Sequence, residues 1–226
     1  GGSFAGLALV RGLVQALGSD LRIAIIDRAA KPGVAPNDGR AFAIWAGAKA
    51  VLANLGVWDA IAPDAQPMTS IEISDSALSD GIRPTRLTYD ALTDDGEPAA
   101  YMVPAAALAS ALFASIEGEP SVTWIAPAEA ESLSLGKHSA DIALRDGSQI
   151  SASLVVAADG RTSKLRDAAG ITTLRRGYDQ TGIVATVKFG EPHNGVAIQH
   201  FLPGGPFAIL PLKDNRACIT WSAARE

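Results

Sequence analysis

The feature that most constrains the fold is the glycine-rich opening of the chain, residues 1–6, which read GGSFAG. Residues Phe4–Leu17 then carry apolar side chains at helical spacing, and Gly18 follows as a stop signal. The next segment, Leu21–Asp27, is a short apolar run rich in β-branched residues, which is typical of a buried parallel strand. The chain therefore begins as a glycine turn, a helix and a strand that ends in an acid.

Three small residues of the opening turn stand at the positions of a dinucleotide-binding fingerprint, namely Gly1, Ser3 and Gly6. In such a fold the first glycine forms the turn, the second lets the backbone approach the pyrophosphate, and the third lets the helix pack on the strand. The N-terminus of the helix then offers free N–H groups to phosphate oxygens. Ser3 departs from glycine, but its side chain is small and its hydroxyl could donate to a phosphate. We expect the strand before Gly1 to be missing, so that the chain is truncated at its start.

Asp27 strengthens the prediction of nucleotide binding. It ends the predicted strand and lies 21 residues after Gly6. This spacing is close to the ~20 residues expected for the acid that binds the ribose hydroxyls in a dinucleotide fold. The alternative is an ordinary aspartate at the end of a strand. Spacing and strand context together favour the ribose contact.

The composition excludes several other classes of protein. A net charge of −5, without a cluster of Lys and Arg, argues against a nucleic-acid partner. Cys218 is the single cysteine, so neither an internal disulfide nor a cysteine-rich metal site can form. No apolar run reaches the ~18–20 residues that a membrane-spanning helix needs. We therefore expect no bound metal, and a cytoplasmic protein whose contact with the inner membrane is at most peripheral.

The rest of the chain alternates predicted helices and strands before it becomes nearly all strand. Helices are predicted over Arg40–Leu55, Ala105–Ile116 and Ser163–Ala169. A loop is expected at Lys31–Asn37 and a polar, turn-rich segment at Ser76–Pro98. Strands are predicted over Thr69–Ser74, Tyr101–Val103, Val122–Ile125, Ala130–Leu135, Asp141–Leu144, Ser148–Ser153, Leu154–Ala158, Gly182–Phe189, Val196–Phe201, Phe207–Leu212 and Ala217–Trp221.

This order predicts an α/β fold, α+β overall, with two regions. Residues 1–177 would form a dinucleotide-binding region with a parallel sheet, helices on both faces and strand insertions at about 69–103. Residues 178–226 would begin a second, mainly antiparallel sheet.

Two later stretches bear on which nucleotide is bound. The first is segment 38–58, which opens with Asp-Gly-Arg and so presents Arg40. The second is segment 154–166, in which the strand Leu154–Ala158 would deliver Asp159 at its carboxyl end, where ligands sit in open α/β sheets. Gly160 permits a tight turn there, and Ser163 can cap the helix that follows. The alternative is a surface Asp-Gly turn before a solvated basic helix.

A third stretch covers residues 193–212, with the run GPFAILPL, and is followed by Trp221. In this order, and over nearly the whole chain, the three stretches resemble the flavoprotein aromatic hydroxylases, most closely the hydroxylases of ubiquinone biosynthesis. The resemblance implies FAD as cofactor and NAD(P)H as co-substrate. It implies FAD contacts at Gly1, Ser3, Gly6, Asp27, Arg40 and Asp159.

The resemblance also implies the reaction. NAD(P)H would reduce bound FAD, and the reduced flavin would use O2 to hydroxylate an activated phenol ring, so that the difficult chemistry belongs to the cofactor. We expect no catalytic nucleophile among the side chains. The apolar strands around Val196–Leu212 would form part of the substrate wall, which suits a polyprenylated phenol of ubiquinone biosynthesis.

Two departures from the family pattern limit these expectations. Pro104–Ala107 stand where the family often has a polar or basic residue, and the later Gly-Asp motif of the family has no counterpart before Glu226. We therefore expect the chain by itself to be inactive. Two alternatives stay open: a flavin hydroxylase of a small soluble aromatic compound, and a non-catalytic nucleotide-binding module.

Overall fold

The computed structural model describes residues 1–30, 39–77 and 79–225, and the loop predicted at Lys31–Asn37 lies outside these ranges. The chain divides into two compact units. The first consists of residues 1–35 and 109–176, and the second of residues 36–108 and 177–226. These bounds differ from the predicted regions 1–177 and 178–226, because strands from residues 36–108 pair with strands from the end of the chain.

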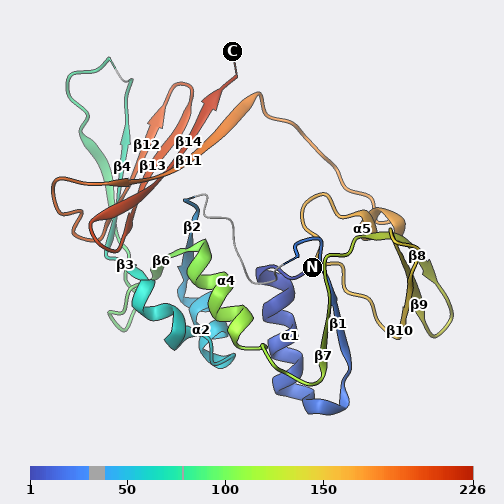
Figure 1. Ribbon diagram of the computed structural model, residues 1–226. Coiled ribbons are helices and arrows are strands. Elements are labelled where there is room, and N and C mark those ends of the chain that lie inside the picture. Colours follow the sequence, from blue (N-terminus) through green and yellow to red (C-terminus); the bar gives the residue numbers. More distant parts are fainter. Residues whose placement is uncertain (31–38, 78, 226) are drawn as a thin grey trace. The chain divides into compact units, whose positions relative to one another are not determined.

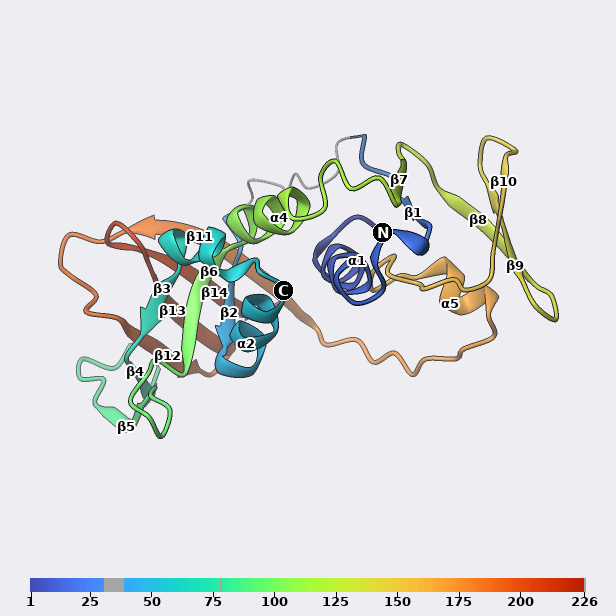
Figure 2. The same ribbon diagram turned by 90° about the horizontal axis from the view of Figure 1, so that it is seen from below.

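The first unit contains the predicted glycine turn, helix and strand. Helix α1 (Phe4–Leu17) is confirmed with the predicted bounds, and the 3-10 turn η1 (Gly18–Asp20) follows it. Strand β1 (Ile23–Ile26) pairs in parallel with β7 (Val122–Ile125). Both views show α1 beside these two strands (Figures 1 and 2). The helix buries Leu7 and Val10, and β1 buries Ile25, so one apolar face of each element supplies the local core.

The first unit also holds a three-stranded antiparallel sheet. Its order is β10-β9-β8, formed by β10 (Gln149–Ala152), β9 (Ala140–Leu144) and β8 (Ala130–Leu135). The Asp146-Gly147 turn joins β9 and β10 into a hairpin. Gly147 has φ +87°, which glycine tolerates, and the Asp146 carboxylate accepts the backbone N–H of Ser148 at 2.9 Å.

The prediction of a buried strand at Leu154–Ala158 is wrong. Within the described part of the chain this segment has no strand assignment and joins no sheet, and the parallel sheet contains only β1 and β7. Leu154 is 78% exposed and Val156 52% exposed. A continuous apolar run becomes a buried strand only where neighbouring strands pair with it and layers cover it. The short helix after this segment, α5 (Lys164–Ala168), is confirmed.

The second unit is built on a six-stranded sheet (Figure 1). Its order is β11-β14-β13-β12-β4-β5. The strands are β11 (Gln180–Lys188), β14 (Arg216–Ala224), β13 (Gly205–Leu212), β12 (Val196–Leu202), β4 (Ser70–Asp75) and β5 (Thr85–Asp90). All pairs are antiparallel except β12 with β4. The mainly antiparallel sheet predicted from Tyr178 onward is therefore present, and the earlier strands β4 and β5 extend it.

A smaller antiparallel sheet in the second unit has the order β2-β6-β3. It consists of β2 (Ala41–Trp45), β6 (Ala100–Pro104) and β3 (Gln66–Met68). Its accompanying helical elements are α2 (Ala46–Asn54), α3 (Trp58–Ile61) and η2 (Ala62–Asp64). Helix α4 (Ala105–Ala114) begins in this unit, and its residues from Ala109 onward belong to the first unit. The core of the unit joins both sheets, with Met68 and Met102 from the smaller one packed against Ala197, Leu212 and Cys218 from the larger one.

Two further predictions in this unit are wrong. The single helix expected over Arg40–Leu55 is a strand, β2, followed by the shorter helix α2. Pairing with β6 overrides the helical preference of the alanines, since local propensity is a weak determinant against tertiary pairing. The polar segment Ser76–Pro98 contains β5, which was missed because all six of its residues are exposed at the edge of the sheet and so give no apolar alternation.

Candidate functional site

The turn formed by residues 1–6 has no room for side chains at its glycines. A methyl group on Gly1 would overlap the carbonyl oxygen of Ala158, and one on Gly6 would overlap the carbonyl oxygen of Gly1. At Gly2 a methyl group would lie 2.9 Å from the ring of Trp124. The backbone of the turn is thus packed against its surroundings at each of these glycines. Such a backbone cradle, without side chains, is what close approach to a pyrophosphate requires.

The N-terminus of α1 extends this cradle. Ser3 is the N-cap residue; its side chain is exposed and makes no capping hydrogen bond. The first turn of the helix contains no acidic residue. The first N–H groups of a helix have no partner within the helix, and the helix dipole adds a partial positive charge. The arrangement at Ser3 therefore favours an anion.

Asp27 lies directly beside the glycine turn, as its spacing from Gly6 predicted. One carboxylate oxygen accepts the backbone N–H of Gly2 at 2.5 Å, and the other accepts the N–H of Ala29 at 2.7 Å. An ionised carboxylate offers about four acceptor positions, so each oxygen keeps capacity for a further donor. Asp27 can therefore hold the turn in place and still accept the hydroxyl groups of a ribose.

Asp159 lies close to the same turn. A methyl group on Gly1 would lie 3.6 Å from the Cα of Asp159, and one oxygen of Asp159 accepts the N–H of Leu165 at 3.4 Å. The other oxygen, Oδ1, is buried and has no hydrogen-bond partner. Burial favours the neutral acid, but hydrogen bonds from Ser163 and from backbone N–H groups outweigh it and lower the pKa of Asp159. An ionised oxygen without a protein partner can accept a hydrogen bond from a ligand.

Arg40 is the one predicted site residue outside the first unit. It belongs to the second unit, its side chain is exposed, and its carbonyl accepts the N–H of Ala105 at 3.0 Å. Gly1, Ser3, Gly6, Asp27 and Asp159 all belong to the first unit. The structure thus brings five of the six predicted residues together around one turn.

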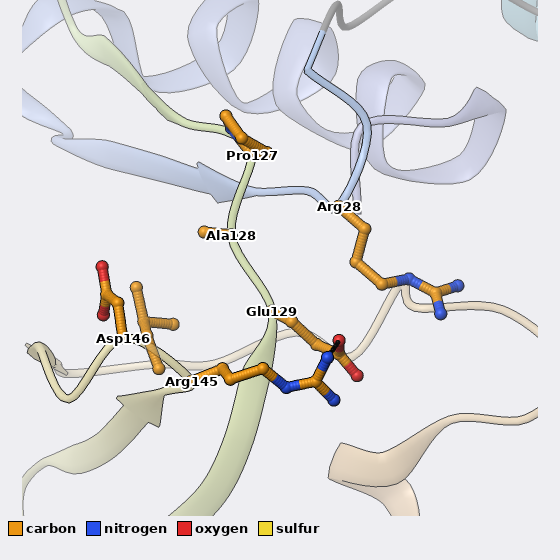
Figure 3. A pocket seen from close by; sticks show the side chains of 7 residues that line it. Arg28, Pro127, Ala128, Glu129, Arg145 and Asp146 are labelled. Carbon is orange, nitrogen blue, oxygen red and sulfur yellow. Dashed lines mark ion pairs between the residues drawn. The ribbon is translucent and has the colours of Figure 1, made fainter.

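A cavity of about 370 Å³ opens at the carboxyl ends of β1 and β7 (Figure 3). Arg28 contributes from the segment after β1, and Pro127, Ala128 and Glu129 from the segment after β7. The carbonyl of Asp27 accepts the N–H of Ala128 at 2.7 Å, so the cavity adjoins the predicted ribose acid. Ligands of open α/β sheets bind at this edge.

Glu129 is the charged centre of this region. Its two carboxylate oxygens form ion pairs with Arg145 at 2.7 Å and with Lys164 at 2.6 Å. Figure 3 shows Glu129 and Arg145 pointing toward one another. The hydrogen bond from Lys164 is the main cause that lowers the pKa of Glu129; burial opposes it, and the charge of Arg145 adds to the lowering. Glu129 therefore ties β8 to the β9–β10 turn and to α5.

Sequence reasoning missed several residues of this region. Gly2 stood inside the recognised turn, but its N–H contact with Asp27 depends on how the turn and β1 meet. Arg28 and Glu129 could have been found from their positions, because each follows shortly after the end of a predicted strand, where ligands of such sheets bind. Within the described residues there is no group of three or more His, Cys, Asp or Glu side chains arranged to hold a metal, and no helix that could cross a membrane.

Fold and site together define a dinucleotide-binding protein, because a tight glycine turn, a helix N-terminus and a strand-end aspartate meet in one unit. Comparison with protein families gives the same result. The family described as FAD binding domain matches residues 1–226, and the chain belongs to this family. The cradle without side chains at the glycines and the unpartnered oxygen of Asp159 both fit such a cofactor.

Two relatives have names that refer to ubiquinone chemistry. Ubiquinone hydroxylase UbiL of Rhodospirillum rubrum is 38% identical over 185 residues, which is 82% of this chain and 42% of the relative. The 3-demethoxyubiquinol 3-hydroxylase of Escherichia coli is 32% identical over 225 residues, 98% of this chain and 55% of the relative. The predicted resemblance to hydroxylases of ubiquinone biosynthesis is confirmed. The chain spans about half the length of these curated relatives.

Solved structures share the fold. PqsL of Pseudomonas aeruginosa, in complex with 2-aminobenzoylacetate, has a TM-score of 0.81 at 19% identity, over 99% of this chain and 59% of that one. HpxO of Klebsiella pneumoniae, complexed with FAD and uric acid, has a TM-score of 0.78 at 19% identity, over 100% of this chain and 55% of that one. The mixed α/β fold class is therefore confirmed.

Proposed function

We propose that this chain is the FAD-binding part of an NAD(P)H-dependent monooxygenase that hydroxylates a phenolic ring in ubiquinone biosynthesis. The observation that carries the proposal is the convergence of Gly1, Asp27 and Asp159 on one turn, in a chain whose relatives are ubiquinone hydroxylases. The whole protein's reaction is inferred from those relatives. The first unit contains the residues that we propose bind FAD, and their role can be tested directly.

The adenosine half of FAD would lie along the edge formed by the turn and the end of β1. The pyrophosphate would meet the N-terminus of α1, with Ser3 as a further donor, because free N–H groups gather there. Asp27 would accept the ribose hydroxyls. The cavity bordered by Arg28 and Pro127 would hold the adenine ring, since it adjoins Asp27 and lies within the range of ligand pockets of about 300–1,000 Å³.

Asp159 would contribute charge beside the cofactor. The buried oxygen of Asp159 would accept a hydrogen bond from the bound molecule, which would remove the cost of about 1–3 kcal/mol for an unsatisfied polar atom. Bound FAD supplies the redox chemistry, and the role of the site's side chains is to bind and orient it.

The substrate that we propose is a lipophilic phenol. β12 and β13 contain buried apolar residues such as Ala197 and Leu212 and partly exposed ones such as Ile198, Phe207 and Ile209. A second cavity of about 390 Å³ near the end of these strands is lined mainly by apolar groups, among them Leu202, Trp221 and Ala223. An apolar wall of this kind favours a polyprenyl chain over a small polar ring.

The cofactor assignment is tested at Asp27 in the intact protein. Asp27→Ala should weaken FAD binding by about 10- to 150-fold, which corresponds to about 1.5–3 kcal/mol for a lost charge-assisted hydrogen bond. Asp27→Glu should be milder, because the carboxylate is kept. Asp20→Ala, at an exposed aspartate of the same unit, serves as the matched control. Unchanged FAD affinity of Asp27→Ala in a fluorescence titration would reject the ribose contact.

The reaction and the substrate are tested by NAD(P)H oxidation. Visible flavin absorbance of the purified intact protein separates a flavoenzyme from a non-catalytic nucleotide-binding module. Polyprenylated phenols should then stimulate NAD(P)H consumption and yield a hydroxylated product. Stimulation only by small soluble phenols would instead support the alternative hydroxylase. Flavin binding without stimulation by any phenol would contradict the proposed reaction.

A further inference from the structure

Trp124 lies beside the glycine turn of the first unit. It belongs to β7, and a methyl group on Gly2 would lie 2.9 Å from Cζ3 of its indole ring and 3.3 Å from Oδ2 of Asp27. The φ of Gly2 is outside the left-handed region, so the backbone conformation alone does not require glycine there. Glycine is required at this position because the indole and the carboxylate leave no room for a side chain.

The indole ring is restricted by its other neighbours. Trp124 pairs with Ile25 in the β1–β7 register, and its ring packs against the ring of Phe113, with the ring centroids 5.5 Å apart. Phe113 belongs to the part of α4 that lies in the first unit. The far end of a side chain can usually rotate away from a neighbour, but strand pairing and the aromatic contact restrict this ring. The indole is therefore a fixed surface beside the turn.

The same part of β7 also fixes Asp27. The carbonyl oxygen of Ile125, the residue after Trp124, accepts the backbone N–H of Asp27 at 3.2 Å. One carboxylate oxygen of Asp27 then accepts the N–H of Gly2. Gly2 is thus held between two side chains: the carboxylate binds its N–H, and the indole limits how closely the turn can approach β7.

We infer that Trp124 is a positioning residue for the glycine turn: its indole sets the position of Gly2 and so keeps the Gly2 N–H on Asp27. The inference rests on the proposed binding of FAD at this turn. A carboxylate that is bonded to Gly2 is held in place for the ribose before the ligand arrives, whereas a turn that must be ordered on binding lowers the affinity. Trp124 needs no contact with FAD for this role.

The test measures FAD affinity in the intact protein by fluorescence titration. Trp124→Leu removes the indole and should weaken FAD binding by about two- to tenfold, the range expected when one more group must be ordered on binding. Trp124→Phe keeps an aromatic ring and should have a smaller effect. Thr123→Ala, at an exposed position of the same strand, is the matched control and should bind FAD as the wild type does.

Gly2→Ala distinguishes positioning from a merely structural role. In the wild type its methyl group meets the indole, and FAD binding should weaken by about fivefold, the lower end of the cost of overpacking, because the obstruction is a side chain. In the Trp124→Leu background the methyl group has room on that side, so Gly2→Ala should weaken FAD binding less, although its contact with Asp27 remains. A merely structural role of Trp124 would lower the melting temperature and leave the effect of Gly2→Ala equal in both backgrounds. If Trp124→Leu does not fold, Trp124→Phe takes its place in the cycle.

The outcomes separate this inference from the proposed FAD site. If Asp27→Ala weakens FAD binding but Trp124→Leu does not, or if the effects of Gly2→Ala and Trp124→Leu add, the positioning role is refuted and the FAD site stands. If neither Asp27→Ala nor Gly2→Ala changes FAD affinity, the proposed site is refuted, and the positioning role with it.

Discussion

Substitution of Gly6 in the first turn of α1 sets two effects of opposite sign against each other. Gly6→Ala improves helix propensity by about 1 kcal/mol, since glycine is the poorest ordinary residue in a helix interior. The new methyl group, however, would overlap the carbonyl oxygen of Gly1. This neighbour is backbone, so it cannot rotate away as a long side chain can. The helix or the turn must move.

The overlap between the new methyl group and the Gly1 carbonyl oxygen should outweigh the gain in helix propensity, so that Gly6→Ala destabilises the protein. Overpacking of a closely packed site costs typically about 1–3 kcal/mol, and a backbone contact places Gly6 at the upper end of this range. After subtraction of the helix gain, the net loss is about 2 kcal/mol. For about 150–250 residues this corresponds to a fall in melting temperature of about 4–8 °C. FAD affinity should fall as well, because the displaced turn is the proposed pyrophosphate cradle.

Gly47 provides the matched control in a helix. It lies near the start of α2, and a methyl group there would meet no atom within 4 Å. Gly47→Ala should therefore show the propensity gain alone, up to about 1 kcal/mol, and leave FAD affinity unchanged. Differential scanning fluorimetry of the intact protein measures both variants. A melting temperature of Gly6→Ala equal to or above that of the wild type would refute the reasoning from close packing.

Two further predictions concern α5 and its ion pairs. Ser163 caps α5 by accepting the N–H of Arg166 at 3.0 Å, so Ser163→Ala should cost about 1 kcal/mol by thermal denaturation, whereas Ser163→Thr should not. Ser163→Ala also removes a hydrogen bond that lowers the pKa of Asp159. The pKa of Asp159 should therefore be higher in this variant, as measured by an NMR titration. The pKa of Glu129 lies below its ordinary value of 4.5, so its contribution to stability is present above that pH and is lost as the pH falls through the folded pKa. The stability difference between the wild type and Glu129→Gln should therefore shrink on acidification, and a difference that does not change with pH would contradict the role of the charge.

Local pattern was sufficient for much of the first unit. Helix α1 has the bounds predicted from its apolar spacing and from Gly18, and the Asp-Gly hairpin at Gly147 forms as its turn chemistry requires. The spacing between Gly6 and Asp27 placed an acid beside the glycine turn, where the structure has it. Each of these features depends on residues close together in sequence, or on a spacing that the fold itself fixes.

The local sequence pattern could not predict which distant segments pair as strands. The residues of β2 were predicted as helix because their strand partner, β6 (Ala100–Pro104), lies far away in the sequence and leaves no local pattern in β2. Leu154–Ala158 was predicted as a buried strand because apolar runs look alike whether or not a neighbour covers them. The edge strand β5 was missed because both of its faces are exposed.

The sequence by itself therefore determined the dinucleotide-binding turn, the strand-end aspartate and the family of flavoproteins to which the chain is similar. Only the tertiary structure decided which residues surround that turn and which residues border the cavity beside Asp27. The physical reason is that helix periodicity and turn chemistry act over a few residues, whereas strand pairing and side-chain contacts join residues that are far apart in the sequence.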